Sequence, residues 1–188
     1  MKNIQATSGI NSTIVEELAS EGIIFKAAPL ELMTIRVIYM NMPIMGIGIR
    51  NNYGGYEFYA RHYFKKPVTL LKSGSSTIHF RINRKTCSCC IFSDLLDYLS
   101  YCSITDFHKG DLPRWCDCII IGNPSNFVNA MLDAESYDVI NCILPNTDEG
   151  RTMFSTIQQR SPLRTRDYSA LYRGYDSLKE YVTTQNTE

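Results

Sequence analysis

The polar side chains best placed for chemistry in this 188-residue chain follow three short apolar runs. Ser93 and Asp94 come after the run 89–92, residues 123–125 follow the run 116–122, and residues 145–150 follow the run 139–144. If these runs are parallel strands, their carboxyl ends meet at one edge of a sheet, where ligands bind. Phosphate or metal chemistry there would need clustered carboxylates, because Mg²⁺ takes oxygen ligands, usually from one or two acidic side chains.

A second group with chemical potential is basic. Arg61, Lys65 and Lys66 form the densest basic cluster, and Tyr63 and Phe64 lie between them. Cations mixed with aromatic rings suit phosphate contact combined with base stacking. Lysines that protect an exposed edge strand explain the pattern equally well.

Arg151 is the fourth candidate for contact with nucleic acid. It lies in the expected first turn of a helix, where unpaired backbone amides attract anions. Asp148 and Glu149 share that turn and would repel phosphate, and acidic residues are also common at helix starts because they complement the helix dipole. The pattern therefore favours a structural role for this turn.

The seven cysteines do not form a recognisable metal site. Two groups of cysteines have C-x-C spacing within apolar runs. Cysteines that bind zinc usually have C-x-x-C spacing on a tight turn. An odd number of cysteines also argues against a disulfide framework. We expect reduced, buried thiols without zinc, and structural roles for His79 and His108, which have no second ligand at a useful spacing. The cysteines are Cys87, Cys89, Cys90, Cys102, Cys116, Cys118 and Cys142.

The pattern of the second half of the chain predicts the strands and helices that would position the polar side chains after the three apolar runs. Apolar strands alternate with amphipathic helical segments, which is typical of a parallel sheet covered by helices on both faces. The expected strands are 89–92, 116–122, 139–144 and a weak 164–168, and the expected helices are 94–102, 125–135, 148–160 and 177–183.

The first half has a different pattern. Ser12 or Thr13 can cap a short amphipathic helix that Gly22 ends. Short alternating segments separated by turn residues then predict an antiparallel meander. Its expected strands are 35–40, 45–50 and 56–61, and 77–82 is one more possible strand after the turn at Gly74. We therefore expect two units, an N-terminal helix plus β-rich subdomain over 1–86 and an α/β domain over 87–188.

Composition narrows the function classes. The 19 basic and 19 acidic side chains cancel, which argues against a strongly basic nucleic-acid coat protein but allows a local patch. No window approaches 18 apolar residues, and the first residues are polar with no signal-peptide pattern. We expect a cytoplasmic protein with no membrane span.

Several spaced motifs resemble one known family. Residues 46–57 (GIGIRNNYGGYE), 92–100 (FSDLLDYLS) and 144–151 (LPNTDEGR) are similar to motifs of bacterial mobile-element primase-like proteins, and residues 167–181 also fit. The second half resembles a toprim domain, the Rossmann-like α/β module shared by primases, topoisomerases and related nucleases. This resemblance implies a toprim-type sheet in which the first strand ends in a catalytic glutamate and the third in an Asp-x-Asp pair that holds divalent metal.

The chain departs from the family at those metal-binding positions. Ser93 stands where the family has the glutamate, and Pro145 and Thr147 stand where it has the two aspartates. The loss of all three removes the charge that would hold the metal. We also expect no zinc-ribbon module of the kind that often precedes this domain in primases.

The resemblance and its departures imply a degenerate, non-catalytic toprim or primase-like module with no cofactor. Its expected partners are single-stranded nucleic acid or another replication or mobilisation protein. One alternative is an active metal-dependent primase or nuclease that uses the relocated acids Asp94, Asp148 and Glu149. A further alternative is a pure protein-interaction subunit, which suits the neutral net charge.

Overall fold

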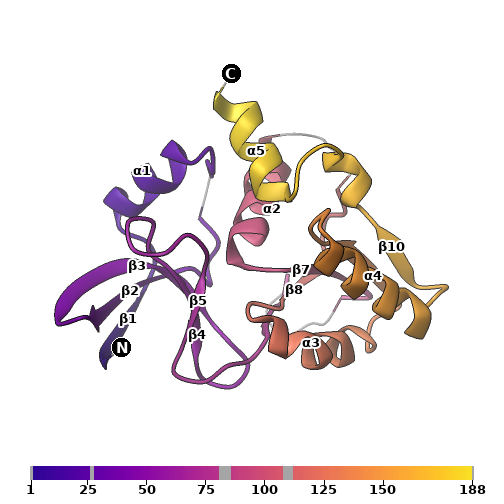
Figure 1. Ribbon diagram of the computed structural model, residues 1–188, viewed down its shortest axis with the longest axis horizontal. Coiled ribbons are helices and arrows are strands. Elements are labelled where there is room, and N and C mark those ends of the chain that lie inside the picture. The colour runs from indigo at the N-terminus through magenta and orange to yellow at the C-terminus, as the bar shows by residue number, and fades with distance from the viewer. Residues whose placement is uncertain (1, 26–27, 81–85, 108–111, 188) are drawn as a thin grey trace.

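The computed structural model describes residues 2–25, 28–80, 86–107 and 112–187. His108, the end of the expected strand 77–82 and part of the expected domain boundary lie outside these ranges. The described chain folds around two sheets, which lie on opposite sides of the molecule in Figure 1. No helix in the described part of the chain is long and apolar enough to cross a membrane.

The first sheet is an antiparallel meander in the order β1-β2-β3-β4-β5. Its longest hairpin turns at Met40 and Asn41, which both have positive φ (49° and 62°), as a two-residue hairpin turn with the twist of the strands requires. Helix α1 (Ser12–Ser20) lies between the first two strands in sequence and is capped by Asn11, whose side chain accepts from the Thr13 amide. The strands are β1 (Lys2–Ser8), β2 (Met33–Tyr39), β3 (Met42–Arg50), β4 (Tyr56–Tyr59) and β5 (Val68–Leu70).

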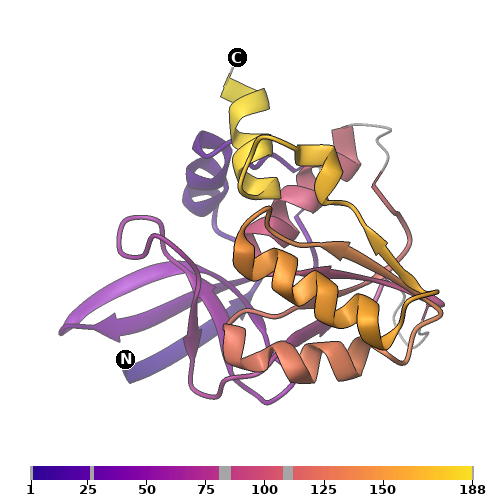
Figure 2. The ribbon, with the colours of Figure 1, turned by 45° about the vertical axis from the view of Figure 1, so that its right-hand side comes forward.

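The second sheet has the order β10-β9-β7-β8-β6, and all its pairs are parallel except the antiparallel edge pair β6–β8. Helices α2 (Leu95–Phe107) and α5 (Leu178–Thr187) pack on one face, and α3 (Phe127–Ala134) and α4 (Asp148–Arg160) cover the other (Figure 2). The strands are β6 (Ser76–Ile78), β7 (Ser88–Phe92), β8 (Asp117–Ile120), β9 (Val139–Ile143) and β10 (Thr165–Asp167), with 3₁₀ turns at Pro124–Asn126 and Ser169–Tyr172.

These two sheets confirm the expected mixed α/β architecture, an antiparallel sheet followed by a mainly parallel one with helices on both faces. Two strands, β1 and the three-residue β5, were not expected from the sequence. The further strand expected at 77–82 is observed in part as β6, which pairs with β8 of the second sheet. The helix cap is Asn11 and not Ser12 or Thr13.

One buried cluster joins the two halves of the chain. It includes Ile14 and Leu18 of α1, Ile47 of β3, Leu99 of α2 and Val182 of α5. Burial of these side chains removes apolar surface from water across the boundary between the sheets. The two sheets are therefore held in a fixed relation, and the space between their edges has a defined shape.

Five of the seven cysteines are buried, as expected from the sequence. Cys89, Cys90, Cys116, Cys118 and Cys142 are buried, Cys102 is half-buried, and Cys87 is exposed. Cys87 is thus an exception to the prediction of buried thiols: it precedes β7 and lies outside the strand that buries its neighbours.

Candidate functional site

A cleft of about 870 Å³ lies between the first sheet and the carboxyl ends of β7 and β9. One wall comes from the loop between β4 and β5, and the opposite wall from the starts of α2, α4 and α5. Ser93, Pro145 and Thr147 all line it. Ser93 and the pair Pro145 and Thr147, which are distant from it in the chain, therefore line the same cleft.

Ser93 is held by a buried carboxylate. Its Oγ donates to Asp97 Oδ2 at 2.8 Å, and the Lys179 amide donates to Asp97 Oδ1 at 3.0 Å. Burial, followed by the neighbouring charge of Asp94, raises the pKa of Asp97 to about 7. Asp97 thus ties the start of α5 to the strand end, which is the structural role that its position in the first turn of α2 suggests.

Asp94 is the N-terminal cap of α2. Its Oδ1 accepts from the amides of Leu96 at 2.9 Å and Asp97 at 3.1 Å. Burial raises the pKa of Asp94 above its usual range, against the lowering effect of these amides. Because the carboxylate already serves the helix end, it is poorly placed to act as a relocated metal ligand.

Glu57 is the cleft residue that sequence reasoning missed. Its side chain points into the cleft from β4 with 1% of the residue exposed, and Oε1 accepts from Thr69 Oγ1 at 2.8 Å. Burial raises its pKa to about 7. Gly122, at φ +70°, packs so closely that a Cβ there would lie 2.3 Å from Glu57 Oε1. Its sequence signals were its place at the end of the motif 46–57 and a charged residue within an alternating strand.

The first turn of α4 is capped and braced even though Pro145 and Thr147 replace the two aspartates of the family motif. Thr147 is the N-cap, and its Oγ1 accepts from the Gly150 amide at 3.3 Å. Asn146 Nδ2 donates to the carbonyls of Ser169, Tyr172 and Tyr175 at 3.2, 3.1 and 3.0 Å. These residues therefore brace the turn between β9 and α4 against the 3₁₀ segment.

The relocated acids all line the cleft, but two of them are committed to other partners. Asp148 is fully exposed and pairs with Arg151 at 2.6 Å, Glu149 is also exposed, and Asp94 is committed to its helix cap. Among the described residues, no group of three or more His, Cys, Asp or Glu side chains is arranged to hold a metal ion. The three-carboxylate set of the family motif is therefore not reproduced at Ser93, Pro145 and Thr147.

The structure separates the four basic residues singled out from the sequence. Lys65 and Lys66 line the cleft, and both are exposed. Arg61 instead faces α1, where it lies 3.4 Å from Glu21 and donates to the Glu17 carbonyl at 3.3 Å and to Ser20 Oγ.

Arg151 also has partners, since it donates to Asp148 and to the Asn146 carbonyl. Of the two aromatic residues in the basic cluster, Phe64 packs edge-on against Tyr39 and Phe58, whereas Tyr63 is 45% exposed. Lys179, from the start of α5, also lines the cleft, but its ammonium is paired with Glu21 Oε2 at 2.8 Å, and it was not singled out from the sequence.

Comparison with solved structures relates this fold to primases. The chain is similar to the primase fragment of the bacteriophage T7 primase–helicase protein, with a TM-score of 0.58 and 10% identity over 97% of this chain and 71% of that one. It is also similar to a chain in the bacteriophage T7 complex of lagging-strand DNA polymerase with primase domains bound to an RNA/DNA hybrid and dTTP, with a TM-score of 0.52 and 11% identity over 97% of this chain and 89% of that one. No family model and no curated protein matches the sequence. The chain therefore has a primase-like fold.

Proposed function

We propose that this protein is a degenerate primase-like module that binds single-stranded nucleic acid in the cleft and performs no metal-dependent chemistry there. One observation carries the proposal: Ser93, Pro145 and Thr147 line the same cleft as Lys65 and Lys66. In the motifs that the sequence resembles, the first three positions are carboxylates that hold metal. Their replacement leaves the place of a primase site without its metal ligands.

The assignment of a toprim-type domain to residues 87–188, and of a β-rich subdomain to residues 1–86, is part of this proposal. The strand order and the helices on both faces of the second sheet support it, with β6 contributed from the N-terminal side of the division. The proposal also includes a mobile-element context and a replication or mobilisation protein as partner, in keeping with the primase-like fold.

The charge of the cleft suits weak, sequence-independent contact with phosphates. Lys65 and Lys66 supply two exposed cations on one wall, whereas the Lys179 ammonium is paired with Glu21 Oε2 at 2.8 Å. On the floor, the raised pKa values of Glu57 and Asp97, both about 7, leave these carboxyls partly protonated at neutral pH. Protonation weakens the repulsion that buried carboxylates would otherwise exert on a nucleic-acid backbone. Binding should accordingly strengthen as the pH falls from 8 to 6.

A binding assay tests the proposal. We expect fluorescence anisotropy with labelled oligothymidine to detect binding at low salt, with a log–log salt slope of roughly −1.4 for two phosphate contacts on a single strand. The double variant Lys65→Glu/Lys66→Glu should abolish it, and a chelator should leave wild-type binding unchanged. Arg166→Glu/Arg173→Glu is the matched control, because both side chains are exposed and neither lines the cleft.

Three outcomes would contradict the proposal. Binding that survives the lysine reversal places the nucleic-acid site elsewhere. The absence of any binding at low salt would exclude a nucleic-acid-binding function and would favour the alternative of a pure protein-interaction subunit. Binding or catalysis that requires added Mg²⁺ would instead support the alternative of an active enzyme with relocated acids.

A further inference from the structure

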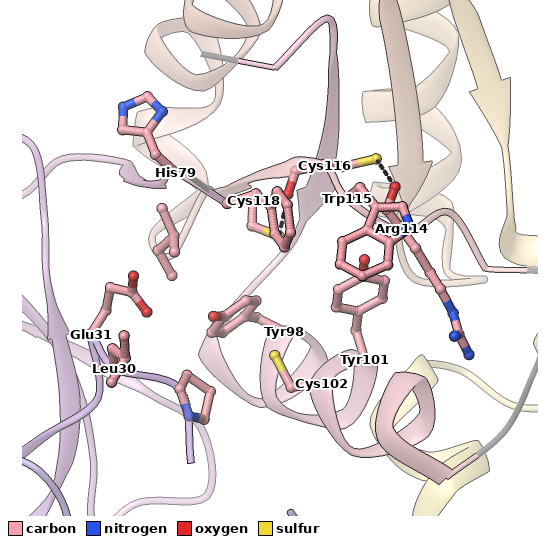
Figure 3. A pocket seen from close by; sticks show the side chains of 13 residues that line it. Leu30, Glu31, His79, Tyr98, Tyr101, Cys102, Arg114, Trp115, Cys116 and Cys118 are labelled. Atoms are coloured by element: carbon pink, nitrogen blue, oxygen red, sulfur yellow. Dashed lines mark hydrogen bonds between the residues drawn. The ribbon is translucent and has the colours of Figure 1, made fainter. Parts of the chain in front are cut away.

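A second pocket lies at the opposite end of the parallel sheet from the cleft. It has a volume of about 410 Å³ and lies beside the amino end of β8, where four aromatic side chains line it (Figure 3). Tyr98 and Tyr101 come from α2, whereas Phe80 follows β6 and Trp115 precedes β8. A pocket of this size suits a small organic molecule.

The aromatic walls are held in place by contacts within the protein. The Tyr101 hydroxyl donates to the Pro113 carbonyl at 2.6 Å, which fixes the turn before Trp115. The Phe80 amide donates to Oδ1 of the buried Asp117 at 3.1 Å. Phe80 and Trp115 pack edge-on, with ring centroids 5.0 Å apart. Because the walls are formed in advance, a ligand would lose little affinity to ordering them.

Two of the four rings remain accessible from solvent. Trp115 is 70% exposed and Phe80 is 41% exposed. The backbone of Trp115 also has a positive φ of 62°, a conformation that bulky residues rarely adopt. Strained backbone is concentrated at binding and catalytic sites, where it presents a side chain in a required position. The strain at Trp115 therefore indicates that its indole is presented to a ligand.

A carboxylate lies beside these rings. Glu31 lines the pocket and is exposed, and it has no hydrogen bond or ion pair within the part of the chain that the structure describes. Figure 3 shows Glu31 on one side of Tyr98 and Trp115 on the other. Burial above all, and the charge of Glu31 in addition, raises the pKa of the Tyr98 hydroxyl. The negative potential of Glu31 therefore reaches the aromatic wall.

His79 and Arg114 also line the pocket and can carry positive charge. His79 Nδ1 lies 2.7 Å from Asp117 Oδ2, so that a buried carboxylate holds the ring, in keeping with the structural role expected from the sequence. The guanidinium of Arg114 points away from Tyr98 in Figure 3. A charge placed between Tyr98 and Trp115 would therefore feel Glu31 more strongly than Arg114.

We propose that this pocket binds a small alkylated ammonium compound, with its cationic head against the rings of Trp115 and Tyr98 and beside the Glu31 carboxylate. The face of an aromatic ring attracts cations, and that of tryptophan does so most strongly. An alkylated nitrogen is less strongly hydrated than a primary ammonium, so that its transfer into an aromatic pocket costs less free energy. The proposal is independent of the nucleic-acid function proposed for the cleft.

Fluorescence tests the selection of charge, because Trp115 is the only tryptophan of the chain. We would titrate the protein, at constant ionic strength, with choline and with its uncharged isostere dimethylbutanol, in which a carbon atom replaces the nitrogen. Choline should change the fluorescence saturably, and the alcohol should bind about tenfold more weakly. Equal affinities of the two compounds, or no saturable change with choline, would overturn the proposal.

Glu31→Gln tests the carboxylate. The change removes the charge and keeps the size of the side chain, so that choline should bind about threefold more weakly while the affinity for dimethylbutanol stays the same. Glu16→Gln is the matched control, because Glu16 is an exposed carboxyl on α1 that does not line the pocket. A folded Glu31→Gln variant that binds choline as the wild type does would contradict the role of Glu31.

Trp115→Leu tests the aromatic face, since leucine keeps an apolar side chain without a ring. The NMR line width of choline follows binding in the absence of tryptophan fluorescence, and the affinity should fall about fivefold. Unchanged affinity in the folded variant would show that choline binds elsewhere and would sink the proposal.

Discussion

Glu57→Gln should stabilise the protein at alkaline pH. Gln is close in shape, and its carbonyl oxygen can still accept from Thr69 Oγ1, so that the change mainly removes the buried charge. The rise in the Glu57 pKa from 4.5 to about 7 means that the folded protein holds this proton more tightly than the unfolded chain. Stability from this group is therefore greatest at low pH and is lost as the pH rises from about 4.5 to 7.

The difference between the folded and unfolded pKa values of Glu57 sets the size of the gain in stability. Each pH unit between the folded and unfolded pKa values is worth about 1.4 kcal/mol, which gives about 3 kcal/mol for Glu57 once both states are ionised. A neutral Gln avoids this cost. The variant should exceed the wild type by about 3 kcal/mol at pH 8, and the difference should shrink to about 1 kcal/mol at pH 5.

Urea denaturation at both pH values measures this difference. The midpoint should shift to higher urea with an unchanged slope, since the surface exposed on unfolding is the same. Glu16→Gln, an exposed carboxyl on α1, serves as the control and should change little at either pH. A Glu57→Gln variant that is less stable than the wild type at pH 8, or a gap that does not narrow at pH 5, would refute the account of the buried carboxyl.

Two further results are expected. Gly122→Ala should lower the free energy of unfolding by more than about 2 kcal/mol, because a Cβ would meet the Glu57 carboxylate and because φ +70° strains any residue other than glycine. Thermal or urea unfolding measures this loss. A loss below about 1 kcal/mol would show that the loop moves freely. Native mass spectrometry of protein grown with zinc should give the mass of the bare chain, since the described cysteines form no cluster suited to a metal; a stoichiometric zinc adduct lost to chelator would contradict this.

The elements most accurately predicted from the sequence are those with local signals. The helix expected at 148–160 is observed as Asp148–Arg160, because Thr147 caps it, acidic residues fill its first turn and Arg160 lies in its last. The buried parallel strands are also visible as apolar runs, since both of their faces pack against helices. By contrast, β1 is a mostly exposed edge strand whose polar residues resemble a loop.

The details that decide the site depend on contacts distant in sequence. The sequence places Arg61 close to Lys65 and Lys66, but Glu21, forty residues earlier, draws it toward α1. Glu57 is buried only because the loop at Gly122 closes over it. The partner of β6 is likewise set by the register with β8, which alternation within the strand cannot reveal. Tertiary packing determined these features, and no local pattern encodes it.

The central claim, that the cleft is a primase-type metal site emptied of its ligands, is tested most directly by putting the carboxylates back. The triple variant Ser93→Glu/Pro145→Asp/Thr147→Asp adds three acids beside Asp97 and Asp94, so that without metal it should melt at a lower temperature than the wild type. Pro145→Ala is the control, because removal of a proline also loosens the unfolded chain.

The decisive measurement is the melting temperature of the triple variant with and without Mg²⁺. A metal that binds only the folded state at ten times its Kd adds about 1.4 kcal/mol of stability. The account predicts that Mg²⁺ raises the melting temperature of the triple variant and leaves those of the wild type and of Pro145→Ala unchanged. A triple variant that melts like Pro145→Ala and ignores Mg²⁺ would show that these positions do not form one metal site, and would contradict the claim.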